Sequence, residues 1–204
     1  ETQFRAILRA AAHGPVRILL PMVTTPSEVR RAREILGHAA HRLRRRRVAI
    51  PEALPPVGAM IEVPGAALAA DALAKTCDFF DIGSNDLTMY TLAIDRANEA
   101  VAHLFDPLHP AVLRLMQFSA EAGLRAGIPV SICGEIAGDP RFAALLVGFG
   151  IKELSMTATS IPRVKQRIRA MDALAARRRA LLIMDQTDSG RISMLLDDFN
   201  ALQE

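Results

Sequence analysis

The sequence has few cysteines, no long apolar run and little excess charge of either sign, and each shortage excludes a class of protein. Its two cysteines, Cys77 and Cys133, provide no disulfide framework. No apolar run approaches the roughly 18 residues needed to cross a bilayer. A net charge of +3 is too small to indicate electrostatic binding of nucleic acid. We therefore expect a cytoplasmic protein with no membrane or nucleic-acid partner.

The chain is long enough for one substantial core. It has 204 residues, of which 50% are hydrophobic, so we expect a single domain. It begins at Glu1, inside a segment that already has a helical pattern, and no signal peptide is recognisable there. We interpret this start as a cut within a larger protein.

Apolar runs typical of buried strands alternate with helical patterns along the chain. The pattern predicts strands at 17–23, 57–61, 78–83, 129–133 and 152–156. It predicts helices at 3–12, 26–46, 65–75, 110–126, 140–147, from 161 onward, 173–184 and 190–202. This order indicates an α/β fold with a parallel sheet of about five strands. A closed barrel of eight strands typically needs about 250 residues, so the sheet is either open or the later part of a barrel.

Two carboxylates follow neighbouring predicted strands. Glu62 ends one strand at a Val-Pro-Gly turn, and Asp86 follows the next strand. Because loops after parallel strands gather on one face, we expect the two side chains to lie together. Two carboxylates suit Mg²⁺, which keeps waters and shares oxygens of a substrate. The alternatives are ordinary ones: Asp86 as a helix cap and Glu62 in a salt bridge at a strand end.

Three further polar residues are candidates for the same face. Asn85 stands beside Asp86, and Arg96 follows a helix-like stretch that could return over the site. A guanidinium binds carboxylate or phosphate through paired hydrogen bonds, although Arg96 is also compatible with an ordinary surface position. Cys133 ends another strand, where a thiol is a proton donor, a nucleophile or simply a small buried hydrophobe.

Four separated motifs carry a resemblance to a known family. MIEVPGAA, GSNDLTMYTLAIDR, CGEIAGDPR and ELSMTATSIPRVK occur in this order between residues 60 and 165. Together they resemble the C-terminal, PEP-utilising domain of enzyme I of the bacterial phosphotransferase system, the phosphoenolpyruvate–protein phosphotransferase. The resemblance extends from about residue 2 to about residue 170. It implies a (β/α)₈ TIM barrel of the phosphoenolpyruvate-binding type, truncated at its N-terminal side.

The resemblance also implies roles for the candidate residues. Glu62 and Asp86 would be ligands of Mg²⁺, the implied cofactor. Asn85, Asp86 and Arg96 would bind phosphoenolpyruvate. Cys133 would be the acid that protonates the enolate carbon as pyruvate forms. Mg²⁺ and arginine would offset the charge of the moving phosphoryl group.

The family implies partners and a domain plan as well. The phosphoryl group would pass to a histidine on a separate N-terminal domain and then to a carrier phosphoprotein. That domain and the arginines of the first barrel strands are missing, so we expect the isolated piece to be inactive. We expect residues 1–172 to form the partial barrel and 173–204 to form a helical C-terminal tail of the same domain. The barrel is a dimerisation module in the family, and we expect a homo-oligomer.

Departures from the family pattern are small. GSND replaces the more usual GTND, and Met89 stands where glutamine is common, which removes one polar contact. Two other hypotheses stay open: a part of a pyruvate phosphate dikinase or phosphoenolpyruvate synthase, and a non-catalytic dimerisation module. Within the phosphotransferase reading, a role in sugar transport and a role in nitrogen regulation are both open, because these branches differ mainly in their N-terminal domains.

Overall fold

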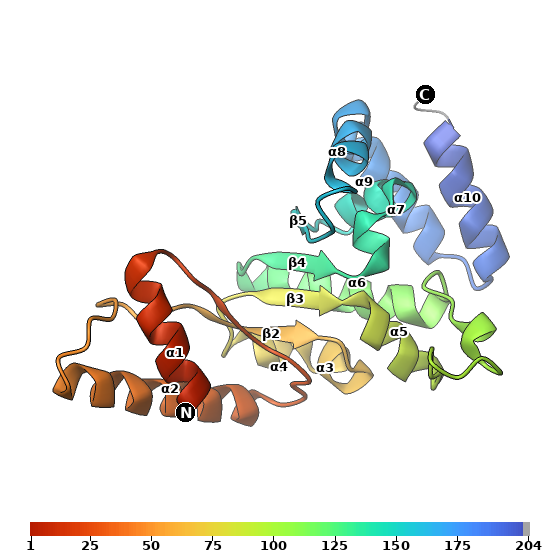
Figure 1. The fold of residues 1–204 in the computed structure, drawn as a ribbon. Helices are drawn as coiled ribbons and strands as arrows, with labels where there is room; N and C mark the ends of the chain where they lie inside the picture. The colour runs from red at the N-terminus through yellow and green to blue at the C-terminus, as the bar shows by residue number, and fades with distance from the viewer. Residues whose placement is uncertain (202–204) are drawn as a thin grey trace.

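The protein is an α/β fold built on one parallel sheet, seen in a computed structural model that describes residues 1–201 (Figure 1). The sheet has five strands in the order of the sequence, each parallel to its neighbours. They are β1 (Ile18–Leu20), β2 (Val57–Ile61), β3 (Phe80–Gly83), β4 (Val130–Cys133) and β5 (Glu153–Leu154). The predicted fold class is therefore confirmed.

Helices follow each strand and continue beyond the last one. They are α1 (Thr2–Ala10), α2 (Pro26–Arg45), α3 (Pro64–Leu68), α4 (Ala70–Ala74), α5 (Ser84–Leu92), α6 (Pro110–Ala126), α7 (Pro140–Gly148), α8 (Ile161–Ala170), α9 (Ala173–Met184) and α10 (Ser189–Ala201). Short 3-10 turns lie at η1 (Ala11–His13), η2 (Ala102–Leu104) and η3 (Glu135–Gly138). None of the helices in residues 1–201 has the length and apolar character that crossing a membrane requires.

The sheet is open but strongly curled. Arg17 immediately precedes β1 and Glu153 begins β5, and their side chains form an ion pair with an Nη2–Oε2 distance of 3.1 Å. In a flat sheet, the outer two of five strands would lie about 19 Å apart, farther than these two side chains together can reach. The two edge strands therefore curve toward each other, as strands of a barrel do.

The two faces of the sheet differ in chemistry. Phe80, Ile82 and Ile132 point to the outer face and are fully buried in the main core, which includes residues of α3, α4 and α6. The period of two in a strand places Asp81 and Ser131 on the opposite, inner face. The inner face thus carries polar groups in the middle of the sheet.

The largest differences in extent from the sequence prediction concern three elements. The strand expected at 17–23 is limited to β1, because Pro21 has no N–H to donate and Met22 adopts a positive φ of 55°. The strand expected at 152–156 is only the two residues of β5. The helix expected at 65–75 is divided into α3 and α4, because Ala69 leaves helical geometry with φ −95° and ψ 11°.

The last helices pack against α7 (Figure 1). Arg141 of α7 donates to both carboxylate oxygens of Asp197 in α10 at 2.6 and 2.8 Å. Asn200 of α10 returns a hydrogen bond to the Arg141 carbonyl at 2.9 Å. The division at residues 172 and 173 stays a prediction, and the last residues of the expected tail, 202–204, lie outside the described part of the chain.

Candidate active site

Glu62 lies directly after β2, and its carboxylate is buried. Only 4% of the residue is exposed, and Oε1 accepts a hydrogen bond from the backbone N–H of Met22 at 2.7 Å. Burial raises the pKa of Glu62, the Met22 hydrogen bond opposes this effect, and the nearby charges of Asp86 and Asp81 raise the pKa further. Within residues 1–201, Glu62 has no arginine or lysine partner, so the salt-bridge alternative is wrong.

A glycine in the neighbouring strand allows Glu62 to pack this closely. A Cβ on Gly83 would lie 2.9 Å from the Cβ of Glu62 and 3.0 Å from its Oε2 atom. Distances this short require one of the two groups to move. Because Gly83 has no side chain, the carboxylate of Glu62 has room to pack against the end of β3.

Asp86 lies in the first turn of α5, close enough to Glu62 to influence its pKa. The N-cap of α5 is Gly83, and no side chain caps this end, so the expected alternative role of Asp86 as a helix cap is wrong. Glu62 and Asp86 therefore come from two successive strand ends and share one region of negative charge.

Two carboxylates alone supply too few ligands for a divalent cation, and the remaining oxygens would have to come from water or a ligand. A buried carboxylate without a cationic partner is unfavourable, and a bound cation removes that penalty. Within residues 1–201, no group of three or more His, Cys, Asp or Glu side chains is arranged to hold a metal ion. Two carboxylates with further oxygens from water and substrate are typical of Mg²⁺. The residues present therefore fit the implied ion.

The loop after β3 is tied to the loop after β4. Ser84 Oγ donates to the Cys133 carbonyl at 2.7 Å, and Asn85 Oδ1 accepts from the Glu135 N–H at 3.2 Å. Gly134 makes this approach possible, because its φ of 98° suits glycine and a Cβ there would collide with Ser84 Oγ. Asn85 and Cys133 are thereby held side by side.

Arg96 comes from the loop that follows α5. Its Nη1 atom lies 2.8 Å from Glu135 Oε1, and its guanidinium carbon lies 4.9 Å from the ring centre of Phe105. The aromatic ring and the carboxylate hold the guanidinium beside the β4 loop. Arg96 therefore has specific partners, and its Glu135 contact links it to Asn85.

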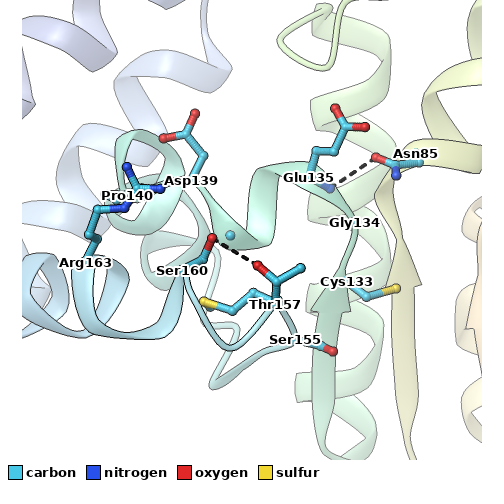
Figure 2. Close-up of a pocket in the computed structure, with 12 residues that line it drawn as sticks. Asn85, Cys133, Gly134, Glu135, Asp139, Pro140, Ser155, Thr157, Ser160 and Arg163 are labelled. Carbon is cyan, nitrogen blue, oxygen red and sulfur yellow. Dashed lines mark hydrogen bonds between the residues drawn. The ribbon is translucent and has the colours of Figure 1, made fainter.

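Cys133 ends β4, and its sulfur is directed toward β3 (Figure 2). The thiol donates to the Ile82 carbonyl at an S–O distance of 3.6 Å. Burial, followed by the nearby carboxylates of Asp81, Glu62 and Asp86, raises the pKa of Cys133 to about 12. A thiol in this setting keeps its proton at neutral pH. Of the three roles left open by the sequence, those of a proton donor and of a small buried hydrophobe agree with this environment, and that of a thiolate nucleophile does not.

A pocket of about 690 Å³ opens beside Cys133 (Figure 2). Asn85 and Cys133 line it on one side, and residues after β5 and from the start of α8 line the other. Glu62, Asp86 and Arg96 are outside its lining. The predicted residues thus form two groups. One group is Glu62 with Asp86, and the other is Asn85 with Arg96 and Cys133. The two groups meet where Asn85 and Asp86 are neighbours in the sequence.

Three residues near this site escaped the sequence analysis. Asp81 and Ser131 lie on the inner face below Cys133, and strand alternation counted back from Gly83 and Cys133 would have placed them there. Glu135 connects Arg96 to Asn85 through its side chain and its backbone N–H. No local pattern signals that role, because it depends on a long loop closing over β4.

The sequence of this chain matches the model of a known protein family. The model of the PEP-utilising enzyme family, PEP-binding domain, matches residues 1–173. The chain belongs to this family. The resemblance carried by the four sequence motifs is therefore confirmed.

Relatives of the PEP-binding domain family have consistent names. A phosphoenolpyruvate-protein phosphotransferase from Cupriavidus necator is 50% identical over 167 residues, which cover 82% of this chain and 28% of that protein. A protein of the same name from Haemophilus influenzae is 40% identical over 199 residues, which cover 98% of this chain and 34% of the relative. The chain thus spans about a third of the length of these relatives.

Solved structures support the fold. A citrate lyase from Burkholderia xenovorans LB400 aligns with a TM-score of 0.58 at 22% identity, over 98% of this chain and 68% of that one. An HpcH/HpaI aldolase/citrate lyase family protein from Burkholderia cenocepacia J2315 aligns with a TM-score of 0.54 at 20% identity, over 81% of this chain and 68% of that one. At these identities the likeness concerns the fold alone.

Proposed function

We propose that this PEP-binding domain belongs to a cytoplasmic phosphoenolpyruvate–protein phosphotransferase. In such a protein it would bind phosphoenolpyruvate, release pyruvate and pass the phosphoryl group, through a histidine of an N-terminal domain, to a carrier protein. Relatives at 38–50% identity bear this name, which favours it over a dikinase or synthase. The observation that carries the proposal is the position of Cys133, which ends β4 and lines the pocket together with Asn85.

Binding would use charge from both groups of residues. Glu62 and Asp86 would hold Mg²⁺, which supplies positive charge to offset the phosphate and carboxylate of the substrate. Arg96 would exchange its Glu135 partner for an oxygen of phosphoenolpyruvate. Asn85 would orient the same ligand through its amide, because Asn85 is fixed by the β4 loop.

Cys133 would supply the proton that completes pyruvate. When the bond between phosphorus and the bridging oxygen breaks, the electron pair remains on oxygen and an enolate forms. The enolate carbon then takes the proton of the Cys133 thiol, and a thiolate is left at the end of β4. The surrounding carboxylates disfavour that thiolate, so it recovers a proton before the next turnover.

The proposed acid role is tested in the parent phosphotransferase. We expect Cys133→Ala to slow pyruvate release about 100-fold or more, in the range typical for loss of a general acid, while phosphoenolpyruvate still binds. Single-turnover rapid quench and equilibrium binding separate the two effects. Cys77→Ala is the matched control and should leave both unchanged, because Cys77 is buried and precedes β3, whereas Cys133 lies at the carboxyl end of β4. Normal turnover of the Cys133 variant would remove the acid role.

Two further proposals concern assembly and isolated activity. The chain would form a homo-oligomer, which is supported by the strand edges that β1 and β5 leave unpaired within residues 1–201. It would not complete phosphotransfer alone, because the histidine that receives the phosphoryl group would lie in the N-terminal part of the parent protein.

A further inference from the structure

The last helix, α10, has no part in the proposed reaction. The family model ends at residue 173, so α10 lies wholly outside it. In the structure α10 packs against α7 and α9, and α7 begins at the edge of the pocket beside Cys133 (Figure 1). The contacts between α10 and α7 therefore connect the end of the chain to the candidate site.

Arg141, in the first turn of α7, is held by α10 at its side chain and at its backbone. Its Nε and Nη2 atoms donate to the two carboxylate oxygens of Asp197 at 2.6 and 2.8 Å, and Nη2 also donates to Ser193. Asn200 donates to the Arg141 carbonyl at 2.9 Å. Asp197 is more than half exposed, so its charge alone contributes little stability. The paired hydrogen bonds instead fix the orientation of the guanidinium.

The residues just before Arg141 form part of the pocket wall. Gly138, Asp139 and Pro140 line the pocket beside Cys133 (Figure 2). Asp139 is the N-cap of α7, and its Oδ1 atom accepts from the Arg141 N–H at 2.9 Å. The pocket wall and the arginine that α10 holds thus belong to one helical turn.

The same segment leads back to the predicted binding residues. In the 3-10 turn η3 the Asp139 N–H donates to the Ile136 carbonyl at 3.4 Å. Glu135 begins this turn, donates its own N–H to Asn85 and pairs with Arg96. Because residues 136–140 form a short hydrogen-bonded connection, a shift in the first turn of α7 is passed on to Glu135.

The core holds the middle of this segment from the other side. Ile136 and Ala137 are buried in the main core, with 4% and 1% of their surfaces exposed. The loop after β4 (residues 134–139) therefore stays folded without α10. What α10 restricts is the remaining movement of its two ends, one at the pocket wall and one at Glu135.

We propose that α10 positions the loop after β4, and that Asp197 and Arg141 are positioning residues for Asn85 and Arg96. Asp197 holds Arg141, Arg141 fixes the first turn of α7, and that turn keeps Glu135 against Asn85. This inference deepens the proposed function and rests on it, because Asn85 and Arg96 are the residues that would bind phosphoenolpyruvate.

Amide-resolved hydrogen exchange by NMR tests this coupling in the chain itself, without a ligand. We expect Asp197→Ala to accelerate exchange of the Glu135 N–H at least about fivefold, because its hydrogen bond to Asn85 opens more often. Asp197→Glu keeps a carboxylate for Arg141 and should restore part of the protection.

Asp198→Ala is the matched control on the same helix. Asp198 is exposed and forms no ion pair within residues 1–201, so this variant loses the same charge and should leave Glu135 exchange within twofold of the parent. Faster exchange in α10 alone, with Glu135 unchanged in folded Asp197→Ala, would overturn the proposal, because it would limit Asp197 to anchoring its own helix.

Asn200→Ala provides a second variant, since it removes the hydrogen bond to the Arg141 carbonyl without changing the charge. Circular dichroism and urea unfolding establish which variants are folded. If neither Asp197→Ala nor Asn200→Ala folds, exchange of the parent chain in low urea decides. Opening of Glu135 and α10 with the same free energy and urea dependence would support the proposal, and independent opening would overturn it.

Calorimetric titration of phosphoenolpyruvate with Mg²⁺ separates this inference from the proposed function. We expect Asp197→Ala to weaken binding about fivefold and Asp198→Ala to bind as the parent does. In the parent phosphotransferase Asp197→Ala should raise KM with kcat nearly unchanged. No binding by the parent chain would count against the proposed function and leave the exchange result to decide the positioning role. Unchanged affinity in Asp197→Ala, where the parent binds, would overturn the positioning of Asn85 and Arg96.

Discussion

The buried negative charge of Glu62 is unfavourable for folding, and the same charge would favour binding of a cation. Its carboxylate is buried beside Asp86 and Asp81, and burial raises its pKa. Because the folded chain favours the neutral form, the contribution of Glu62 to stability is greatest below its ordinary pKa and is lost as the pH rises through the raised pKa. Above the raised pKa the charged form therefore destabilises the fold, and a cation bound beside Glu62 would remove this cost.

Replacing this charge should stabilise the metal-free chain. Glu62→Gln keeps an oxygen for the Met22 N–H and removes the buried charge. We expect a gain of about 1 kcal/mol at pH 7, seen as a rise of roughly 2–4 °C in the unfolding midpoint, with a smaller gain at pH 5. Thermal circular dichroism in EDTA measures it.

The exposed Glu52 offers the control for this prediction. Glu52→Gln should change stability by less than about 0.5 kcal/mol, as is usual for surface positions. A lower midpoint for Glu62→Gln than for the parent chain would mean that the Glu62 charge is already compensated in the fold.

At the scale of single elements, the loop between β4 and α7 depends on one glycine. Gly134 has a φ of 98°, and a side chain there would meet Ser84 and Asn85. We expect Gly134→Ala to destabilise the chain by about 2–4 kcal/mol in urea unfolding, through both strain and collision. The loop would shift away from Asn85, so ligand binding should weaken as well.

Gly127 provides the matched control. Its φ is 71°, but a Cβ there would meet nothing within 4 Å. Gly127→Ala should therefore carry only the backbone penalty, about 1 kcal/mol, and leave binding unchanged. Equal losses for both variants would show that the contact between the two loops is unimportant.

The elements themselves were largely predictable from local pattern. The prediction for β2 has the same bounds as the structure, and α6 and α9 agree as closely, because apolar runs, prolines and glycines mark their ends. Local pattern failed where conformation at a single residue decided the outcome, as at Met22 and Ala69. Apolar character continues across both of these positions, so hydrophobic periodicity alone passes over them.

The site residues that lie at strand ends were predictable from the sequence, whereas the contacts between residues distant in the sequence were not. Glu62, Asn85 and Cys133 follow apolar runs, and this position is visible in the sequence. The Glu135 contact of Arg96 and the Ser131 contact of Asp81 join residues far apart in the chain. Such pairs depend on sheet register and loop closure, which a single sequence does not specify.

At the scale of the whole molecule, we expect self-association through the two edge strands of the sheet, β1 and β5. Both edge strands have free backbone groups within residues 1–201, and such edges favour pairing with another chain. We expect light scattering to give a mass that rises with concentration above the 22.2 kDa of one chain. Arg17→Ala should change this mass little, because the exposed Arg17–Glu153 pair contributes little free energy. A mass of one chain at high concentration would contradict the expectation.

Calorimetric titration of phosphoenolpyruvate into the chain tests the central claim most directly, with Mg²⁺ present and with EDTA in its place. The account predicts binding that requires Mg²⁺ and that weakens at least about tenfold, or 1.4 kcal/mol, in Glu62→Ala, while Glu52→Ala binds as the parent does. Equal affinity in the parent chain and Glu62→Ala, or no binding in either, would contradict the claim that these strand ends form one phosphoenolpyruvate site.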